Sequence, residues 1–346
     1  MWPWLIVLIL LAAPQRAVAD VKASPPPIPL VIGEHERLLV IAPHPDDETL
    51  GAGGLIQRVR SHQGTVRVVL VTAGDGYVEA VVHETGLPQP RPSAYVQYGE
   101  RRLREARAVM RVLDPGGAAR LQFLGFPDGG LDNLLRAHWW RDRPERSATT
   151  QATDPPYDEA VEPDVPYDGA DLRRELVNAL RDSKPTIVVL PDPVDKHPDH
   201  HATGLFTLLA LHDYLASQGK HAVPPRLLAY LVHWPDWPPG WNAASPAAIG
   251  SDTPLVLPAG LHHYALTTTS LTLNAKEIAT KRAALAKYTS QQEAMPAVLA
   301  AFVRQTEPFV VLSPAPPLEI GRWIEHRGRH PLPPQTPREE PSREPK

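Results

Sequence analysis

Short runs of nearly continuous apolar residues recur along the chain and predict buried strands. Residues 37–43 (RLLVIAP), 65–72 (TVRVVLVT) and 186–191 (TIVVLP) are rich in β-branched side chains and contain few polar positions. Strands that are buried on both faces have this composition, and such strands are typical of parallel sheets. We expect further strands at residues 226–234 and 309–312.

The segments between these runs follow a different period. Apolar residues recur three or four positions apart, as one face of a helix requires. Strand and helix therefore alternate, which predicts an α/β fold: a Rossmann-like, mostly parallel sheet with helices on both faces. The expected helices are residues 50–62, 98–113, 171–182, 202–217 and 275–288.

Two connections are longer than most loops of compact domains. They are residues 74–97 and residues 125–166, and the second is rich in Trp, Arg, Asp and Pro. Loops of this length are commonly functional. We expect long loops to cover a site at the C-terminal edge of the sheet, which would make the second loop a lid or a small subdomain.

The composition bounds the partners and the chemistry. The formal net charge is −4, and Lys and Arg are spread along the chain without a basic stripe, so we expect no nucleic-acid partner. The chain has no cysteine, which excludes disulfides and thiolate ligands. A bound metal would therefore need histidine and carboxylate ligands.

The N-terminus has the pattern of an export signal. An apolar run at residues 5–13 is followed by AVA at residues 17–19, the small-x-small pattern of a cleavage site. The run would rise about 14 Å as a helix, less than half of a hydrocarbon core of about 30 Å, so we expect no stable membrane span after cleavage. The mature chain would be periplasmic or secreted, with an uncleaved membrane anchor as the alternative.

The predicted organisation is a signal peptide (1–19), a Pro-rich linker (20–35), one folded domain (36–313) and a Pro-rich, partly disordered tail (314–346).

Polar side chains cluster where the first predicted strand ends. His44, Asp46, Asp47 and Glu48 follow it directly. Ligands of open α/β sheets gather outside the carboxyl ends of the strands. The acidic pair could instead only cap the following helix, so this cluster alone leaves both interpretations open.

A second cluster follows the strand predicted at residues 186–191. His197, Asp199 and His200 stand where the next helix begins, so two strands deliver His and Asp to the same edge of the sheet. A His-carboxylate-His set with one open position is what a catalytic zinc ion requires, and unbound Asp and His nearby can move protons. The two clusters together favour a metal-dependent enzyme.

Residues 42–48 (APHPDDE) and 197–200 (HPDH) resemble two motifs of the PIG-L/LmbE family, zinc hydrolases that remove acetyl groups from N-acetylglucosamine-type sugars. The family signature is Ala-His-Pro-Asp-Asp-Glu, in which Pro43 is an extra residue, and the second element is His-x-Asp-His. In some relatives a tyrosine lies two residues before that element, where this chain has Asp195. The resemblance runs from about residue 36 to residue 312. Weaker resemblances lie at residues 102–106 (RLREA), 123–129 (FLGFPDG) and 281–291, a Lys-x-x-Ala…Ser-Gln element.

The resemblance implies the metal ligands and the general base. His44, Asp47 and His200 would bind zinc, and Asp46 would accept a proton from the attacking water. His201 stands beside His200, but adjacent residues on a helix point about 100° apart, so one of the two faces the metal. The family match favours His200. Ligands of this type also accept other divalent metals, such as Fe2+.

The resemblance also implies supporting residues. His197 would be protonated and would act as general acid or oxyanion stabiliser, with Asp199 orienting a histidine. Arg102 and Asp128 would bind substrate hydroxyls or phosphates, although an exposed helix charge and a turn residue fit them too. His233 could reach the rim of the same site or pack against the core.

The function that the resemblance implies is removal of an acetyl group from an N-acetylated sugar or glycoconjugate by zinc-activated water. One alternative is another zinc hydrolase, acting on an acylated amine or a phosphoester, because zinc polarises a carbonyl or a phosphoryl group alike. A second alternative is a carbohydrate-binding protein without turnover, against which the complete set of catalytic residues argues. The sequence predicts neither the exact sugar nor the oligomeric state.

Overall fold

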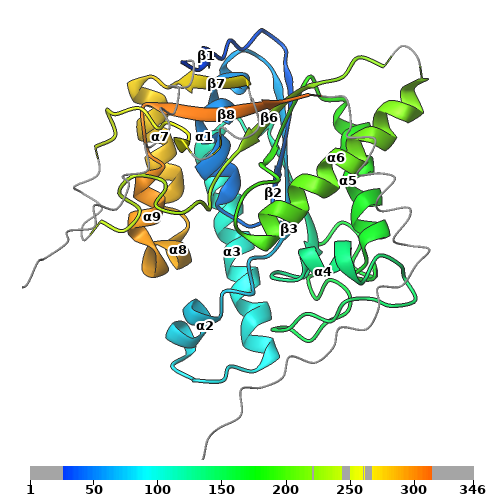
Figure 1. Cartoon of the computed structure of the whole chain (residues 1–346). Coiled ribbons are helices and arrows are strands. Elements are labelled where there is room, and N and C mark those ends of the chain that lie inside the picture. Colours follow the sequence, from blue (N-terminus) through cyan, green and yellow to red (C-terminus); the bar gives the residue numbers. More distant parts are fainter. Residues whose placement is uncertain (1–25, 220–221, 244–249, 260, 262–266, 314–346) are drawn as a thin grey trace, which may run out of the picture.

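In the part of the chain that the structure describes, a mixed sheet of eight strands forms the middle layer (Figure 1). The computed structural model describes residues 26–219, 222–243, 250–259, 261 and 267–313. The strands are β1 (Ile28–Pro29), β2 (Arg37–Ala42), β3 (Thr65–Thr72), β4 (Arg120–Phe126), β5 (Ile187–Pro191), β6 (Arg226–Tyr230), β7 (Thr267–Thr272) and β8 (Thr306–Leu312). Their order in the sheet is β1-β7-β8-β6-β5-β2-β3-β4.

The strands with the apolar runs lie at the centre of the sheet and are parallel. Val40 of β2 is in register with Val68 of β3 on one side and with Val189 of β5 on the other. β4 and β6 continue the parallel pairing outward from β3 and β5. β8 runs antiparallel to both of its neighbours, β6 and β7. The expected α/β fold with a mostly parallel sheet is confirmed.

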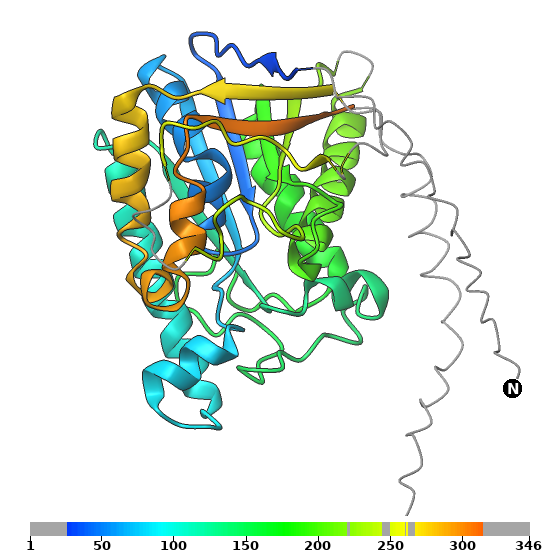
Figure 2. The same cartoon turned by 60° about the vertical axis from the view of Figure 1, so that its left-hand side comes forward.

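Helices cover both faces of this sheet (Figures 1 and 2). Each face has its own core because successive side chains of a strand point to opposite faces. Leu38 and Val40 of β2 belong to one core, and Leu39 and Ile41 belong to the other. The first face carries α1 (Asp47–Ser61), α3 (Pro92–Leu113) and α7 (Ala275–Leu285), and the second carries α4 (Leu131–Arg136), α5 (Gly169–Ser183) and α6 (Pro198–Gln218). The other helices of the described residues are α2 (Val78–Thr85), α8 (Thr289–Ala294) and α9 (Pro296–Ala301).

The structure differs from the sequence-based expectation at several strands. β4 and β7 were not expected, and β7 (TTTSLT) has a single large apolar side chain. Residues 28–29, expected in a linker, form β1 beside β7. Pro29 fits there because a strand at the edge of a sheet tolerates a missing N–H. The strand expected at 226–234 ends at Tyr230.

The two long connections are partly ordered by their own helices. Residues 74–97 contain α2 and the first turns of α3, and residues 125–166 contain α4. Beyond α4 the chain is irregular but fixed to the sheet, because Tyr157 packs in the core of the first face and Tyr167 in that of the second. The Tyr167 hydroxyl donates to the Gly125 carbonyl at 2.9 Å.

The structure describes few of the residues in the predicted terminal segments. The predicted signal peptide and the predicted tail lie outside the described residues, as do residues 20–25 of the linker. Within the described ranges, no helix combines the length and apolar character needed to cross a membrane.

Candidate metal centre

Polar side chains from two neighbouring strands meet at the carboxyl ends of β2 and β5. The chain leaves β2 at Ala42 and enters α1 at Asp47, and it leaves β5 at Pro191 and enters α6 at Pro198. Because β2 and β5 are parallel neighbours, both exits lie at the same edge of the sheet. The predicted metal-binding and catalytic residues occupy these two segments: His44, Asp46, Asp47, His197, Asp199 and His200.

His44, Asp47 and His200 converge on one buried point. Asp47 Oδ2 lies 3.1 Å from His44 Nδ1 and 3.1 Å from His200 Nε2. The possible ligand atoms of the three residues lie within 4.8 Å of one another. Each ring nitrogen of the fully buried His200 faces a carboxylate, but among the described residues neither makes a hydrogen bond of good geometry, although buried nitrogens are normally bonded. A divalent metal of the zinc type fits this set of two imidazoles and one carboxylate around one point.

Carboxylates outside this set face the other side of the two histidine rings. His44 Nε2 lies 3.0 Å from Asp128 Oδ1 and 3.3 Å from Asp199 Oδ2. His200 Nδ1 lies 3.4 Å from Asp195 Oδ2. Metal-binding histidines usually have such a carboxylate on the far nitrogen, which fixes the orientation of the ring. The structure therefore places Asp199 where a histidine-orienting residue is expected, beside His44.

His201, the alternative ligand, points away from this centre. Its Nδ1 is bonded to the carbonyl of Pro193, whereas His200 faces Asp47. The angular separation of adjacent helical residues brings one of the two histidines to the centre, and that histidine is His200.

Negative charge surrounds the candidate centre. Burial lowers the pKa of His44, but Asp128, Asp199 and Asp47 outweigh it and hold that pKa well above its usual value. Burial also lowers the pKa of His200, but Asp47 and Asp195 together raise it to about 10. The carboxylates that hold protons on these rings would equally stabilise a cation, so metal binding would displace the protons.

Asp46 lies next to the centre and is held by Arg102. Arg102 Nη2 is 3.2 Å from Asp46 Oδ2, and its guanidinium also donates to the carbonyls of Gly74 (2.9 Å) and Pro45. Burial raises the pKa of Asp46 to about 8 against the opposing charge of Arg102, with Asp47 adding to the rise. Arg102 was expected to bind substrate; in the structure it is buried, and it bonds Asp46 and the backbone.

His197 and His233 lie on the other side of His200. The ring centroids of His197 and His233 are 4.9 Å apart, and that of His233 is 4.7 Å from His200. Burial and the neighbouring His44 and His200 lower the pKa of His197 to about 3, which favours a neutral ring over the protonated ring that we expected. Its Nδ1 accepts the backbone N–H of Asp199 at 3.2 Å. The neutral ring therefore carries its proton on Nε2.

Residues 39–211, half of the chain, match the model of a protein family described as PIG-L, GlcNAc-PI de-N-acetylase. This chain belongs to the PIG-L family. The match includes both strand ends that form the candidate centre. The family expected from the two motifs is therefore confirmed.

Two deacetylases are similar to about half of this chain. A 1D-myo-inositol 2-acetamido-2-deoxy-alpha-D-glucopyranoside deacetylase of Tsukamurella paurometabola is 34% identical over 185 residues, which cover 52% of this chain and 57% of that protein. A diacetylchitobiose deacetylase of Thermococcus kodakarensis is 27% identical, over 51% of this chain and 49% of that protein. The chain thus spans about half the length of these relatives. The solved structure of N,N'-diacetylchitobiose deacetylase from Pyrococcus horikoshii is 17% identical over 82% of this chain and 87% of its own, with a TM-score of 0.48.

The structure adds residues that the sequence analysis did not assign to the PIG-L site. Asp195, noted only as a departure from the tyrosine of some relatives, accepts the N–H groups of Val232 and His233 and faces His200. Asp75 accepts a hydrogen bond from the Tyr157 hydroxyl, and burial, with Asp128 adding to it, raises its pKa to about 8. Asp75 follows the end of β3 at the same sheet edge, and that position is the signal that could have found it. Tyr157 carries no such signal.

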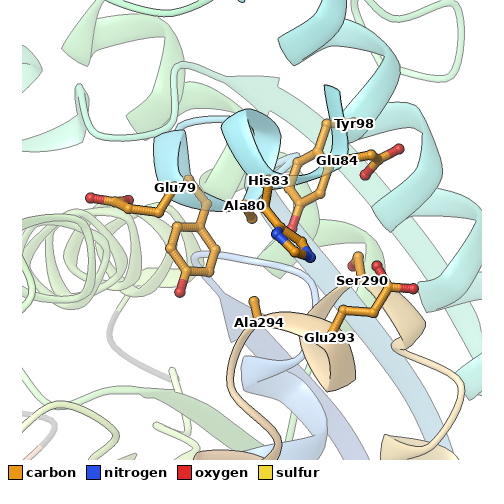
Figure 3. A pocket seen from close by; sticks show the side chains of 9 residues that line it. Glu79, Ala80, His83, Glu84, Tyr98, Ser290, Glu293 and Ala294 are labelled. Atoms are coloured by element: carbon orange, nitrogen blue, oxygen red, sulfur yellow. The ribbon is translucent and has the colours of Figure 1, made fainter. Parts of the chain in front are cut away.

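A hollow of about 240 Å3 lies between α2, α3 and α8 (Figure 3). Tyr98 and Ser290 line its inner part, and Glu84 and Glu293 stand at its mouth, where both pair with Arg101. Tyr98 precedes Arg102 by one turn of α3, so the hollow lies one helical turn away from the residue that holds Asp46.

Proposed function

We propose that this chain is a metal-dependent hydrolase that removes the acetyl group from an N-acetylated sugar, with zinc as its metal. The observation that carries the proposal is the convergence of His44, Asp47 and His200 on one buried point, with Asp46 and His197 beside it. A carboxylate and a histidine next to three metal ligands are the groups that amide hydrolysis requires. Two PIG-L relatives are named as deacetylases of acetamido sugars, which supports the choice of bond and substrate class.

His44, Asp47 and His200 would hold the metal. When bound, a divalent metal supplies a Lewis acid that lowers the pKa of a water molecule and polarises a carbonyl oxygen. Zinc accepts two imidazoles and one carboxylate as ligands, and Fe2+ accepts the same set. Asp199, Asp128 and Asp195 would fix the two rings by their contacts with the far nitrogens.

Asp46 would be the general base. Arg102 bonds Oδ2 and thereby directs the carboxyl group, which leaves Oδ1 to accept a proton from the attacking water. Burial raises the pKa of Asp46 to about 8, and a cation bound beside it would lower that pKa again, so that the carboxylate could accept a proton near neutral pH.

His197 would stabilise the developing oxyanion. Because Nδ1 accepts the N–H of Asp199, Nε2 carries the proton and can donate a hydrogen bond without the ring being charged. Donors of this kind act on charge that develops in the transition state. Asp128, which contacts His44, and the exposed ring of His233, 4.7 Å from that of His200, would contact substrate hydroxyls.

The proposal is tested by supplying the zinc-loaded protein with four substrates: N-acetylglucosamine, diacetylchitobiose, a simple N-acetyl amine and a phosphate monoester. We expect acetate release from the N-acetyl sugars, and we expect it to be lost with a chelator and in Asp46→Asn. Phosphate release without acetate would assign the centre to phosphoester chemistry. Saturable sugar binding without any acetate would contradict a hydrolase and leave a sugar-binding protein.

A further inference from the structure

The backbone of Asp46 adopts a conformation that non-glycine residues rarely adopt. Its φ is 123° and its ψ is −32°. A side chain at positive φ is sterically disfavoured, and such residues persist only where the surrounding structure holds them. Asp46 is also the proposed general base, so the groups that hold its backbone determine where its carboxyl group points.

Two groups hold Asp46 from different sides. Arg102 bonds the side chain, as described above. Glu48 bonds the backbone, because its Oε2 accepts the Asp46 N–H at 3.0 Å. Glu48 is almost completely buried, so this contact is shielded from water.

The other oxygen of Glu48 is bonded to hydroxyl groups. Oε1 accepts hydrogen bonds from Thr49 Oγ1 and from Tyr288 Oη, the latter at 2.6 Å. Tyr288 is fully buried and lies in sequence 240 residues from Glu48, between α7 and α8. Neither Glu48 nor Tyr288 is among the possible ligands of the metal centre.

The segment that carries Tyr288 is anchored independently of the metal centre. Thr289 and Ser290 both donate to Glu105 of α3, and Ser290 does so through its backbone N–H and its hydroxyl. Gln291 Nε2 donates to the Tyr98 hydroxyl at 2.9 Å. Figure 3 shows that Ser290 of α8 and Tyr98 of α3 both line the hollow between these helices. These contacts fix the segment, and with it the Tyr288 hydroxyl, against α3.

We propose that Tyr288, acting through Glu48, is a positioning residue that fixes the strained backbone of Asp46 and thereby aims the general base. The inference rests on the proposed function, because it assumes that Asp46 is the base. It also gives a role to the Lys-x-x-Ala…Ser-Gln element: Tyr288, Ser290 and Gln291 connect the catalytic loop to α3.

The first test compares Tyr288→Phe with wild type, using the zinc-loaded full chain and diacetylchitobiose. Loss of the hydroxyl loosens Glu48, and a small displacement of a base lowers the rate steeply, so we expect kcat to fall about 10- to 100-fold. KM and the zinc content should stay within about twofold, because substrate contacts and ligands are unchanged. A purely structural role would lower the Tm without this loss of kcat.

Tyr167→Phe is the matched control, because Tyr167 is an equally buried tyrosine whose hydroxyl donates a single hydrogen bond, to Gly125 O at 2.9 Å. We expect it to lower the Tm about as much as Tyr288→Phe and to leave kcat unchanged. Equal kcat values for the two variants, or loss of zinc in Tyr288→Phe, would overturn the inference.

The second test places Tyr288→Phe in the Asp46→Asn background. If Tyr288 acts through the base, removing it after the base is gone should change the residual single-turnover rate less than twofold. The same fold-loss in both backgrounds would overturn the inference while leaving the base assignment intact. Full turnover in Asp46→Asn alone would instead contradict the proposed base, and the inference with it.

Discussion

Replacement of Lys281 by methionine should destabilise the protein strongly, because Lys281 completes a kink in α1, the helix that follows the loop of the candidate metal centre. Helix α1 departs from helical geometry at Ala52 (φ −142°, ψ 15°). In a regular helix the Gly54 N–H would bond to the Leu50 carbonyl. Here the Gly54 N–H donates to Glu307 Oε1 at 2.7 Å, and the Leu50 carbonyl accepts from Lys281 Nζ at 2.9 Å.

The size of the expected destabilisation follows from the buried ion pair that Lys281 and Glu307 form. Lys281 Nζ and Glu307 Oε1 are 2.7 Å apart, and both side chains are about 2% exposed or less. Removing one partner of a buried pair costs about 3–5 kcal/mol, because the other charge stays buried without compensation. For a domain of this size that corresponds to a fall in Tm on the order of 10 °C. Adding Glu307→Gln should recover part of the loss, since the uncompensated charge is then removed.

Thermal unfolding followed by circular dichroism, at a fixed metal concentration, measures the effect. Lys276→Met is the matched control, since Lys276 lies on the same helix, α7, and is exposed. We expect the control to change stability by less than about 0.5 kcal/mol. Equal Tm values for Lys281→Met and Lys276→Met would refute the reasoning that the ion pair completes the kink.

Three further predictions concern the centre and the N-terminus. Asp47→Ala should lose bound metal, because one of the three proposed ligands is gone, whereas Asp46→Asn should keep the metal and lose turnover by roughly 100- to 10,000-fold. Metal analysis beside single-turnover rates separates the two variants, and equal metal loss in both would overturn the assignment. His197→Ala should keep zinc content and KM while kcat falls, because a contact made in the transition state is lost; an empty metal site in this variant would make His197 a ligand. If residues 1–19 are removed on export, mass spectrometry of the native protein will find Asp20 at its N-terminus, and intact Met1 in a cytoplasmic fraction would contradict export.

The centre of the sheet and the position of the site could be predicted because their signals are local. β3 occupies the same residues in the structure as in the prediction, since a run of apolar, β-branched residues identifies a doubly buried strand. His44 and His200 could be placed together because parallel neighbouring strands end at one edge. The family match covers residues 39–211, which include both segments.

Other features could not be predicted because they depend on contacts between distant residues. β7 is rich in threonine and owes its strand conformation to pairing with β8 rather than to an apolar pattern. Tyr288 reaches Glu48 across 240 positions of the sequence, and no local pattern marks that contact. Burial lowers the pKa of His197, and three neighbouring histidines, two of them far away in the sequence, lower it further, so its surroundings disfavour the protonated ring that we expected from its role.

The most direct test of the account is a titration of the metal-free chain with zinc, in which bound metal and the rate of acetate release from diacetylchitobiose are measured at each step. The account predicts that the rate rises in proportion to bound zinc up to one ion per chain, and that Asp47→Ala shows neither binding nor rate. Acetate release at the full rate from the metal-free chain would contradict it, as would undiminished zinc binding by Asp47→Ala.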